Sequence, residues 1–340
     1  MIYVIIYLNW IEKGFWMSKK RVLIIKLGAI GDVVHTTIIA SAIKQKHPDW
    51  IVDFLTITPI ISLIENNPNI DNIYDWDFSQ RKSLKYILKI GKILFKNRYD
   101  VIFDPTVSLR TLLLSIIALP KKIMTKKFYG GLWVEDYFMM AKRAIKDLEM
   151  PNRLYIGTNE EADKKIENDI KDYPKPHIAI IPGRNNDKTR PGRVWNINKW
   201  KELTNLLNQN YNGTVFVIGA GNEKEYHQVL LDEKIVMKTG EYSLVESSSF
   251  LSKMDLVISG DTGPIHIASA HNTKTLAILG STSPKQIKPY GENGHWISAK
   301  TECLHCWKKE CKYLKDGEIY TPCMEALSAQ EVFEKVKEIL

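Results

Sequence analysis

The 340-residue sequence predicts an α/β protein built from two doubly wound, parallel-sheet domains that face each other across a cleft. A chain of this length exceeds one typical hydrophobic core, so two domains are expected. Short apolar runs alternate with helical patterns in both halves, which is typical of parallel sheets. Glycine-rich turns follow several of these runs. Such turns place ligands at the carboxyl ends of the strands, in a cleft between the halves.

Composition narrows the class of protein. The hydrophobic fraction of 44% and the charged fraction of 25% are those of an ordinary globular protein. No apolar run reaches the ~20 residues that span a bilayer. The net charge of +8 favours an anionic partner, such as a nucleotide, a phosphorylated substrate, a membrane surface or nucleic acid, without choosing among them. All cysteines lie between Cys303 and Cys323, which favours a reducing cytoplasm over a secreted disulfide scaffold.

The chain begins with residues that we interpret as lying outside the fold. Residues 1–8 are apolar but lack the basic region and cleavage site of a signal peptide. Met17 stands just before the first convincing strand, so residues 1–16 are interpreted as an upstream extension; a weak membrane-touching tail is the alternative. We expect a first domain over residues 17–172 and a second over 173–340, joined at the proline-containing linker 172–176.

The first domain opens with a strand over residues 21–26, a glycine-rich turn over 27–32 and a helix over 33–44. The spacing Gly28-x-x-Gly31 is not the dinucleotide fingerprint, and the charge of Asp32 would repel a pyrophosphate. A carboxylate at a helix start is better suited to act as a general base that faces the cleft. The alternative for Asp32 is a simple N-cap.

A basic stretch follows further strands expected near residues 50–56 and 70–75, and precedes one near 99–104. Residues 81–98 hold seven Lys or Arg and no acidic residue. We expect a helix with lysines on one face and apolar side chains broadly on the other, namely Leu84, Ile87, Leu88, Leu94 and Phe95. Such a helix docks on anionic lipid or on an anionic acceptor, and a solvated surface helix is the alternative. No interleaved aromatic platform accompanies it, so nucleic acid is not an expected partner.

The second domain repeats the alternation, with strands expected near residues 177–181, 214–218, 236–239, 256–258 and 275–279 and a closing helix over 329–340. Asp261, Thr262, Gly263 and Pro264 follow the strand at 256–258 and combine a turn with a helix start. The free N–H groups and the helix dipole at such a start favour phosphate. We therefore expect a phosphate site here; an ordinary β–α turn is the alternative.

The cysteines follow the pattern Cys303-x2-Cys306-x4-Cys311-x11-Cys323. Four thiolates at these spacings suit a tetrahedral zinc and, less well, an iron–sulfur cluster. The alternative interpretations of this pattern are reduced thiols that pack a loop, or an occasional disulfide. If zinc binds, we expect it to act as a structural clip, away from the chemistry.

Three blocks, residues 26–36, 182–200 and 259–268, resemble the ADP-heptose:lipopolysaccharide heptosyltransferases of glycosyltransferase family 9, and residues 275–289 are also similar. The resemblance covers roughly Lys20 to the C-terminus. It implies a GT-B fold with the acceptor domain first and the nucleotide-sugar domain second. It also implies inverting, metal-independent transfer of heptose from ADP-heptose to a Kdo-containing lipid A inner core. The anionic acceptor would lie at the membrane surface, and the enzyme in the cytoplasm at the inner face of the inner membrane.

The resemblance also implies roles for individual residues, with Asp32 as the base. Arg193 replaces the usual lysine beside the donor phosphates, and Asn196 replaces the usual proline. The expected donor-binding residues are Arg193, Glu223 for the ribose, Tyr242 beside the adenine, Asp261, Thr262, Gly263 and His266. His266 is alternatively a packed helix-face histidine. The expected acceptor-binding residues are Gly31, Lys82, Lys85, Lys89 and Arg110.

Two other functions suit the same fold. One is another nucleotide-sugar enzyme, such as an N-acetylglucosaminyltransferase or an epimerase, for which Tyr242 and Glu223 are less well suited because they favour ADP over UDP. The other is a non-catalytic nucleotide- or lipid-binding relative, against which the presence of Asp32 argues.

Overall fold

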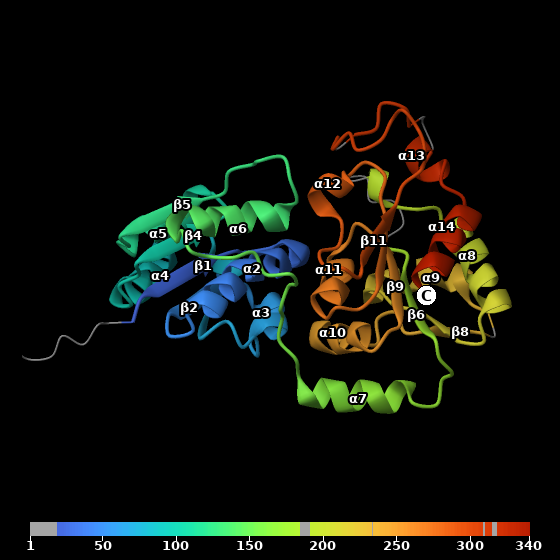
Figure 1. Cartoon of the computed structure of the whole chain (residues 1–340), viewed down its shortest axis with the longest axis horizontal. Coiled ribbons are helices and arrows are strands. Elements are labelled where there is room, and N and C mark those ends of the chain that lie inside the picture. Colours follow the sequence, from blue (N-terminus) through green and yellow to red (C-terminus); the bar gives the residue numbers. More distant parts are fainter. Residues whose placement is uncertain (1–18, 184–190, 233, 309, 315–317) are drawn as a thin grey trace, which may run out of the picture.

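The computed structural model describes residues 19–183, 191–232, 234–308, 310–314 and 318–340. The expected upstream extension and most of the basic loop that precedes Arg193 lie outside these ranges. The described chain forms two parallel β-sheets with helices on both faces, side by side along the long axis of the molecule (Figure 1). The predicted pair of doubly wound α/β domains is therefore confirmed.

The first sheet has the strand order β3-β2-β1-β4-β5, and each neighbouring pair is parallel. Its strands are β1 Arg21–Ile25, β2 Ile51–Thr56, β3 Asn72–Asp75, β4 Val101–Asp104 and β5 Lys122–Thr125. One face carries α2 Ile30–Lys46, α3 Thr58–Ile64 and α6 Trp133–Ala144, and the other carries α4 Leu84–Lys96 and α5 Leu109–Ile117. The pleat separates these layers: Val22 and Ile24 pack toward α2, whereas Leu23 and Ile25 pack toward α4 and α5.

The second sheet has the order β11-β10-β9-β6-β7-β8, also all parallel. Its strands are β6 His177–Ile181, β7 Thr214–Val217, β8 Ile235–Met237, β9 Leu256–Gly260, β10 Thr275–Ile278 and β11 Gly294–Ile297. The helices are α7 Glu160–Ile170, α8 Ile197–Asn210, α9 Lys224–His227, α10 Leu244–Ser252, α11 Gly263–Ala270, α12 Pro284–Ile287, α13 Pro322–Glu325 and α14 Ala329–Ile339. Short 3-10 turns lie at Phe78–Gln80, Pro191–Arg193, Gly221–Glu223 and Gln228–Leu230.

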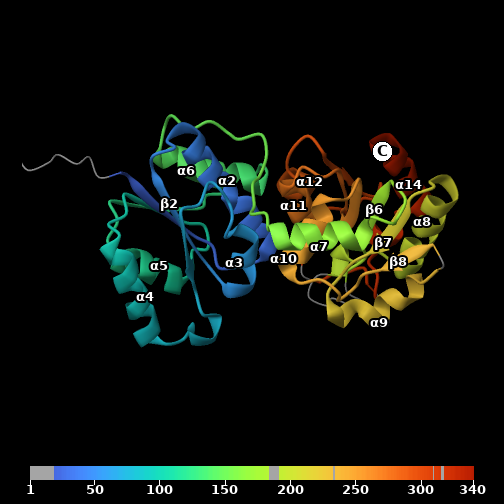
Figure 2. The ribbon, with the colours of Figure 1, turned by 90° about the horizontal axis from the view of Figure 1, so that it is seen from below.

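Helix α7 lies below α10 at the bottom of the view in Figure 1, and it lies in front in Figure 2. It packs on α10, and Lys165 Nζ lies 2.5 Å from a carboxylate oxygen of Glu246. The chain therefore crosses from one sheet to the other before α7, and the expected boundary at residue 172 falls just after this helix.

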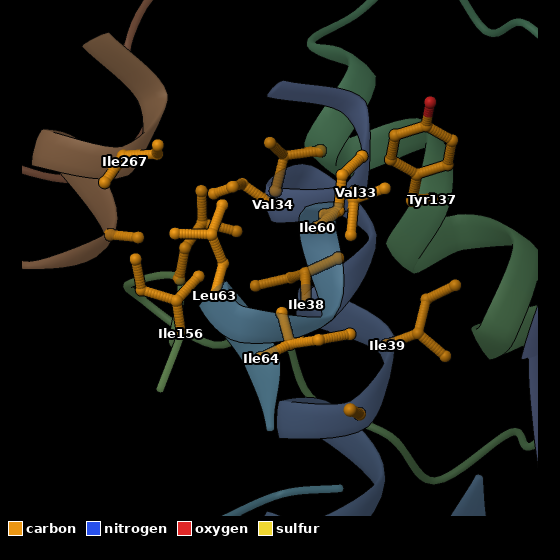
Figure 3. Close-up of a cluster of buried hydrophobic side chains, with 14 of the residues drawn as sticks. Val33, Val34, Ile38, Ile39, Ile60, Leu63, Ile64, Tyr137, Ile156 and Ile267 are labelled. Carbon is orange, nitrogen blue, oxygen red and sulfur yellow. The ribbon is translucent and has the colours of Figure 1, made fainter. Parts of the chain in front are cut away.

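One hydrophobic core runs through both domains. Helix α2 packs against α11 and α3 packs against α10, so that Ile267 of the second domain faces the same buried cluster as Val34 and Leu63 of the first (Figure 3). Burial of this apolar contact holds the two glycine-containing turns, at the starts of α2 and α11, close together.

Helix α4 differs from expectation. It is shorter than the basic stretch because Ser83 caps it, accepting a hydrogen bond from Tyr86 N. Its buried residues are Ile87, Ile90, Gly91 and Leu94, whereas Leu84, Leu88 and Phe95 are exposed. The expected apolar face is therefore only partly buried. Within the described ranges, no helix has both the length and the hydropathy needed to cross a membrane.

Candidate active site

A pocket opens where the two domains meet, at the starts of α2 and α11. The first domain lines it with Ala29, Gly31, Asp32, His35 and Trp133, and the second with Arg193, Asp261, Thr262, Gly263, His266, Ser281, Thr282, Ile287, Trp307 and Lys308. Strand β1 leads into α2 and β9 leads into α11, so each side of the pocket is the carboxyl end of a central strand.

The approach of the two helices depends on glycine. A Cβ added to Gly31 would lie 2.8 Å from Cδ2 of His266, and one added to Gly263 would lie 3.2 Å from Cβ of Ile30. The structure thus brings together Asp32, Gly31, Arg193, Asp261, Thr262, Gly263 and His266, which the sequence assigned to one cleft.

Asp32 lies in the first turn of α2, because the helix begins three residues earlier than expected. One carboxylate oxygen is 3.1 Å from Lys26 Nζ, and the other accepts a 3.5 Å hydrogen bond from the Tyr137 hydroxyl. Burial lowers the pKa of Lys126 to about 8, although the nearby carboxylates of Asp136 and Asp32 oppose this shift. The carboxylate of Asp32 is therefore oriented by two partners and still faces the pocket.

Two histidines that line the pocket, one from each domain, are in contact with each other. His35 Nε2 lies 2.9 Å from His266 Nδ1, and both side chains are buried. Burial lowers the pKa of His35 well below its ordinary value, and His266, Lys126 and Lys26 reinforce the shift. Neutral rings can share one hydrogen bond as donor and acceptor. His266 is thus both a packed helix residue and a residue of the pocket wall.

The opposite wall is the start of α11. Thr262 caps the helix in an extended conformation, and its hydroxyl lies 2.8 Å from that of Ser259. Arg193 Nη1 lies 3.0 Å from a carboxylate oxygen of Asp261. An arginine fork and unpaired backbone N–H groups at a helix start are both suited to a phosphate.

Comparison with known proteins identifies the family. The family model described as "Glycosyltransferase family 9 (heptosyltransferase)" matches residues 114–316, more than half of the chain. The chain belongs to glycosyltransferase family 9, the heptosyltransferases.

Individual relatives agree with this assignment. The chain is 24% identical over 315 residues to the lipopolysaccharide core heptosyltransferase OpsX of Haemophilus influenzae, which covers 85% of this chain and 87% of OpsX. A family 9 glycosyltransferase structure from Veillonella parvula matches with a TM-score of 0.80 at 17% identity, covering 94% of this chain and 97% of that one. The Escherichia coli heptosyltransferase WaaC with ADP matches with a TM-score of 0.72 at 19% identity, covering 94% and 100%. These structures confirm the GT-B fold.

Two expected donor residues of this family 9 glycosyltransferase do not line the pocket. Glu223 accepts a 2.8 Å hydrogen bond from Ala220 N, and the Tyr242 ring packs 5.3 Å from that of Phe250. They follow β7 and β8, further along the same sheet edge, where Gly240 closely approaches Gly221. The expected acceptor residues Lys82, Lys85, Lys89 and Arg110 are exposed around α4 and α5, on the sheet face opposite α2, and are not part of the pocket wall.

Sequence reasoning missed several residues of the pocket. His35 follows Asp32 by one helical turn, so its position on the same face was a usable signal. Trp133 and Trp307 gave no such signal, yet their rings stack at 5.3 Å across the domain boundary. The backbone N–H of Trp307 donates a 2.9 Å hydrogen bond to Ser281 O, and the Arg193 guanidinium lies 5.8 Å from the centre of the Trp307 ring.

The cysteine segment therefore reaches the pocket, through Trp307 and Lys308. None of the four cysteines lines the pocket, so the position of a bound zinc relative to the chemistry stays a prediction. The segment reaches the pocket because β10 ends there and because the backbone N–H groups of His305 and Trp307 bind carbonyl groups just after this strand.

All four cysteines are free thiols. Cys303, Cys306 and Cys311 line one surface hollow, and Cys323 is buried. Burial raises the pKa of the Cys323 thiol, and the three other cysteines add to the shift, so the four lie within electrostatic reach of one another. Among the residues that the structure describes, no three His, Cys, Asp or Glu side chains form a group that could hold a metal ion.

Proposed function

We propose that this family 9 glycosyltransferase transfers a heptose from ADP-heptose to a Kdo-containing lipid A acceptor, with inversion at the anomeric carbon. One observation carries the proposal: the Asp32 carboxylate and the start of α11 line the same pocket from opposite domains. Glycosyl transfer from a nucleotide sugar requires a base for the acceptor hydroxyl opposite a site for the leaving diphosphate, and this arrangement supplies both. Two relatives support the choice of substrates, because one is named a lipopolysaccharide core heptosyltransferase and the WaaC structure contains ADP.

The donor diphosphate binds at the start of α11. The N–H groups there, the Thr262 hydroxyl and the Arg193 guanidinium face the charge that develops on the departing ADP. Lys308 adds a second cation to the same wall. With these groups in place, the proposed reaction uses no catalytic metal ion. Transfer at an unchanged rate in the presence of a chelator supports this point, and loss of transfer that Mg²⁺ restores contradicts it.

Asp32 acts as the general base. Its carboxylate takes the proton of the acceptor hydroxyl as the oxygen bonds to the anomeric carbon, and the bond from that carbon to the ADP oxygen breaks on the opposite face. Lys26 and Tyr137 keep the carboxylate aimed at the pocket through the whole step. The acceptor is anionic, and Lys126 beside Asp32 supplies a positive charge for it below about pH 8.

The test begins with nucleotide binding. Thermal unfolding is measured with ADP, ADP-heptose, UDP and UDP-N-acetylglucosamine. A ligand at a hundredfold excess over its Kd stabilises the folded protein by ~2.7 kcal/mol. We expect ADP and ADP-heptose to give this shift and the uridine nucleotides to give none. Stronger protection by a uridine nucleotide would show that the donor is wrong.

Transfer itself is then measured with ADP-heptose and Kdo-lipid A, and the anomeric configuration of the product is read by NMR. Asp32→Ala should abolish transfer and retain the protection by ADP. Isomerisation of the sugar without an acceptor would instead indicate an epimerase, and binding without any product would indicate a non-catalytic relative.

A structural zinc at the four cysteines stays a prediction that rests on their spacing in the sequence. Metal analysis of the purified protein decides it. About one zinc per chain supports the site, and a metal-free, folded protein with four titratable thiols overturns it.

A further inference from the structure

The positive charge of this chain is concentrated in one segment of the first domain. Residues 78–134 contain twelve Lys or Arg and two Asp, a net charge of +10, whereas the whole chain carries +8. The two acids do not neutralise the surface: Asp104 is buried, and Asp100 is bound to Lys121 Nζ at 2.7 Å and to Arg21 N. The remaining residues together carry a net charge of −2, so this segment accounts for the positive charge of the chain.

Large apolar side chains are exposed in the same segment. On α4 they are Leu84, Leu88, Ile93 and Phe95, and on α5 they are Leu109, Leu112 and Ile116, with Leu119 just beyond the helix. Leu84 is 61% exposed and Leu109 is 84% exposed. Isolated exposed leucines are ordinary, but a group on two neighbouring helices marks an interaction surface.

The two helices form a single layer. A Cβ added to Gly91 would lie 2.5 Å from Cγ2 of Ile117, so α4 and α5 are in close contact. Leu84, Leu88 and Phe95 follow one another at helical spacing along α4, and Lys85, Lys89, Lys92 and Lys96 run along the neighbouring stripe. The layer of α4 and α5 covers the sheet face opposite α2 and α3. Because α2 and α3 contact the second domain, the second domain does not cover α4 and α5 (Figure 2).

We propose that the exposed surface of α4 and α5 is a docking face for an anionic membrane. Leucine and phenylalanine beside a row of lysines match the acyl boundary and the headgroups of a bilayer that contains acidic lipid. Nucleic acid would match the charge and leave the leucines exposed to water. A second copy of the chain would bring two strongly positive faces together. The proposal goes beyond the transfer reaction and does not depend on the identity of the donor.

Docking is tested by flotation of the full-length protein with vesicles of phosphatidylcholine alone or mixed with phosphatidylglycerol. The charge variant is Lys85→Gln, Lys89→Gln and Lys92→Gln together. Each basic residue near an anionic surface contributes about one power of ten or somewhat less to binding, so the variant should bind roughly a hundredfold more weakly. Its control makes the same exchange at Lys164, Lys171 and Lys201, which are exposed in the region of α7 and α8.

A second pair of variants tests the apolar contribution. Leu84→Ser with Leu88→Ser should weaken binding at least about tenfold even when the anionic lipid content is high. The matched control is Val229→Ser with Leu231→Ser, two exposed apolar residues of the second domain. Unfolding midpoints confirm that each variant is folded, and these exposed positions should leave them nearly unchanged.

The outcomes are distinct. Flotation that requires phosphatidylglycerol and is lost in both α4 variants but not in the controls supports the proposal. Equal recovery with neutral vesicles, or equal loss in the controls, overturns it, as does a dimer in solution that the Leu84 and Leu88 changes dissociate. Transfer to a soluble acceptor without acyl chains should be the same in the Leu84 and Leu88 variant and in its control, so failure of docking is separable from failure of the proposed reaction.

Discussion

Asp32→Asn tests the centre of the proposed mechanism. The exchange keeps the size of the side chain and an acceptor oxygen for Tyr137, and it removes the group that takes the proton. Loss of a general base typically costs 10²- to 10⁴-fold in rate, or about 3 to 5.5 kcal/mol of the activation barrier. We therefore expect a fall in kcat of this size with little change in ADP affinity, because the donor contacts come from the second domain.

The same exchange should lower stability. The Lys26 side chain is 9% exposed and has the Asp32 carboxylate at 3.1 Å, so asparagine leaves a nearly buried ammonium without its counter-charge. An orphaned buried group costs about 1 to 3 kcal/mol, and the 25% exposure of the Asp32 side chain favours the lower part of this range. Adding Lys26→Met removes the ammonium group that Asp32→Asn leaves unpaired. The double variant should recover a free energy of unfolding within about 1 kcal/mol of the unaltered protein and remain inactive.

Urea unfolding, ADP titration calorimetry and product formation separate the two effects. If Asp32→Asn retains a rate within tenfold of the unaltered protein, Asp32 is not the base. If the double variant is as unstable as Asp32→Asn alone, the ion pair is not the source of the lost stability. If both stability and rate return in the double variant, the role of Asp32 is structural.

Three further predictions concern the contact between the domains. Gly31→Ala places a methyl group 2.8 Å from His266, so the domains must move apart, and the transfer rate should fall about tenfold or more. Alanine is compatible with the helix, so the protein should still fold. Steady-state kinetics measures the rate, and thermal unfolding checks the fold. Trp307→Ala removes a stacked pair worth about 0.5 to 1.5 kcal/mol and should weaken donor binding several-fold by calorimetry, with Trp307→Phe retaining most of it; equal affinity in all three proteins would exclude a role for the stack. Because burial depresses the pKa of folded His35, the unfolded chain takes up a proton that the folded chain does not as the pH falls below about 6.5, and stability is lost. His35→Gln should lose less stability between pH 7.5 and 5, and a curve parallel to that of the unaltered protein would contradict this.

The sequence was sufficient for the parts of the site that lie at the ends of strands. Asp32 follows β1 and Thr262 follows β9, and both strands are central in their sheets. The carboxyl ends of central parallel strands lie at the edge where ligands bind, so a local pattern predicted a position in the tertiary structure. His35 could have been added by the same reasoning, one turn further along α2.

Other parts of the site depend on distant pairings that no local pattern contains. Trp307 enters the pocket because its backbone N–H binds Ser281 O and because its φ of 54° turns the chain. Neither feature is encoded in a periodicity, and the nearby cysteines drew attention to metal instead. On α4, the spacing placed Ile87 and Leu94 on the buried face, as the structure has them, but it could not show that the buried strip is narrower than the expected apolar face. Leu84 and Leu88 are exposed for that reason.

The contact between α2 and α11 links substrate binding to the arrangement of the domains. Asp32 lies in the first turn of α2 and Thr262 directly precedes α11, and both helices contribute to the core that crosses the domain interface. The distance from the base to the diphosphate site is therefore set by packed helices, and not by a loop. To open the cleft widely, the protein must break the His35–His266 hydrogen bond and expose the contact around Ile267. Both costs stabilise the observed arrangement of the domains relative to an open one. The contact that holds the domains together therefore also keeps the base and the diphosphate site in place.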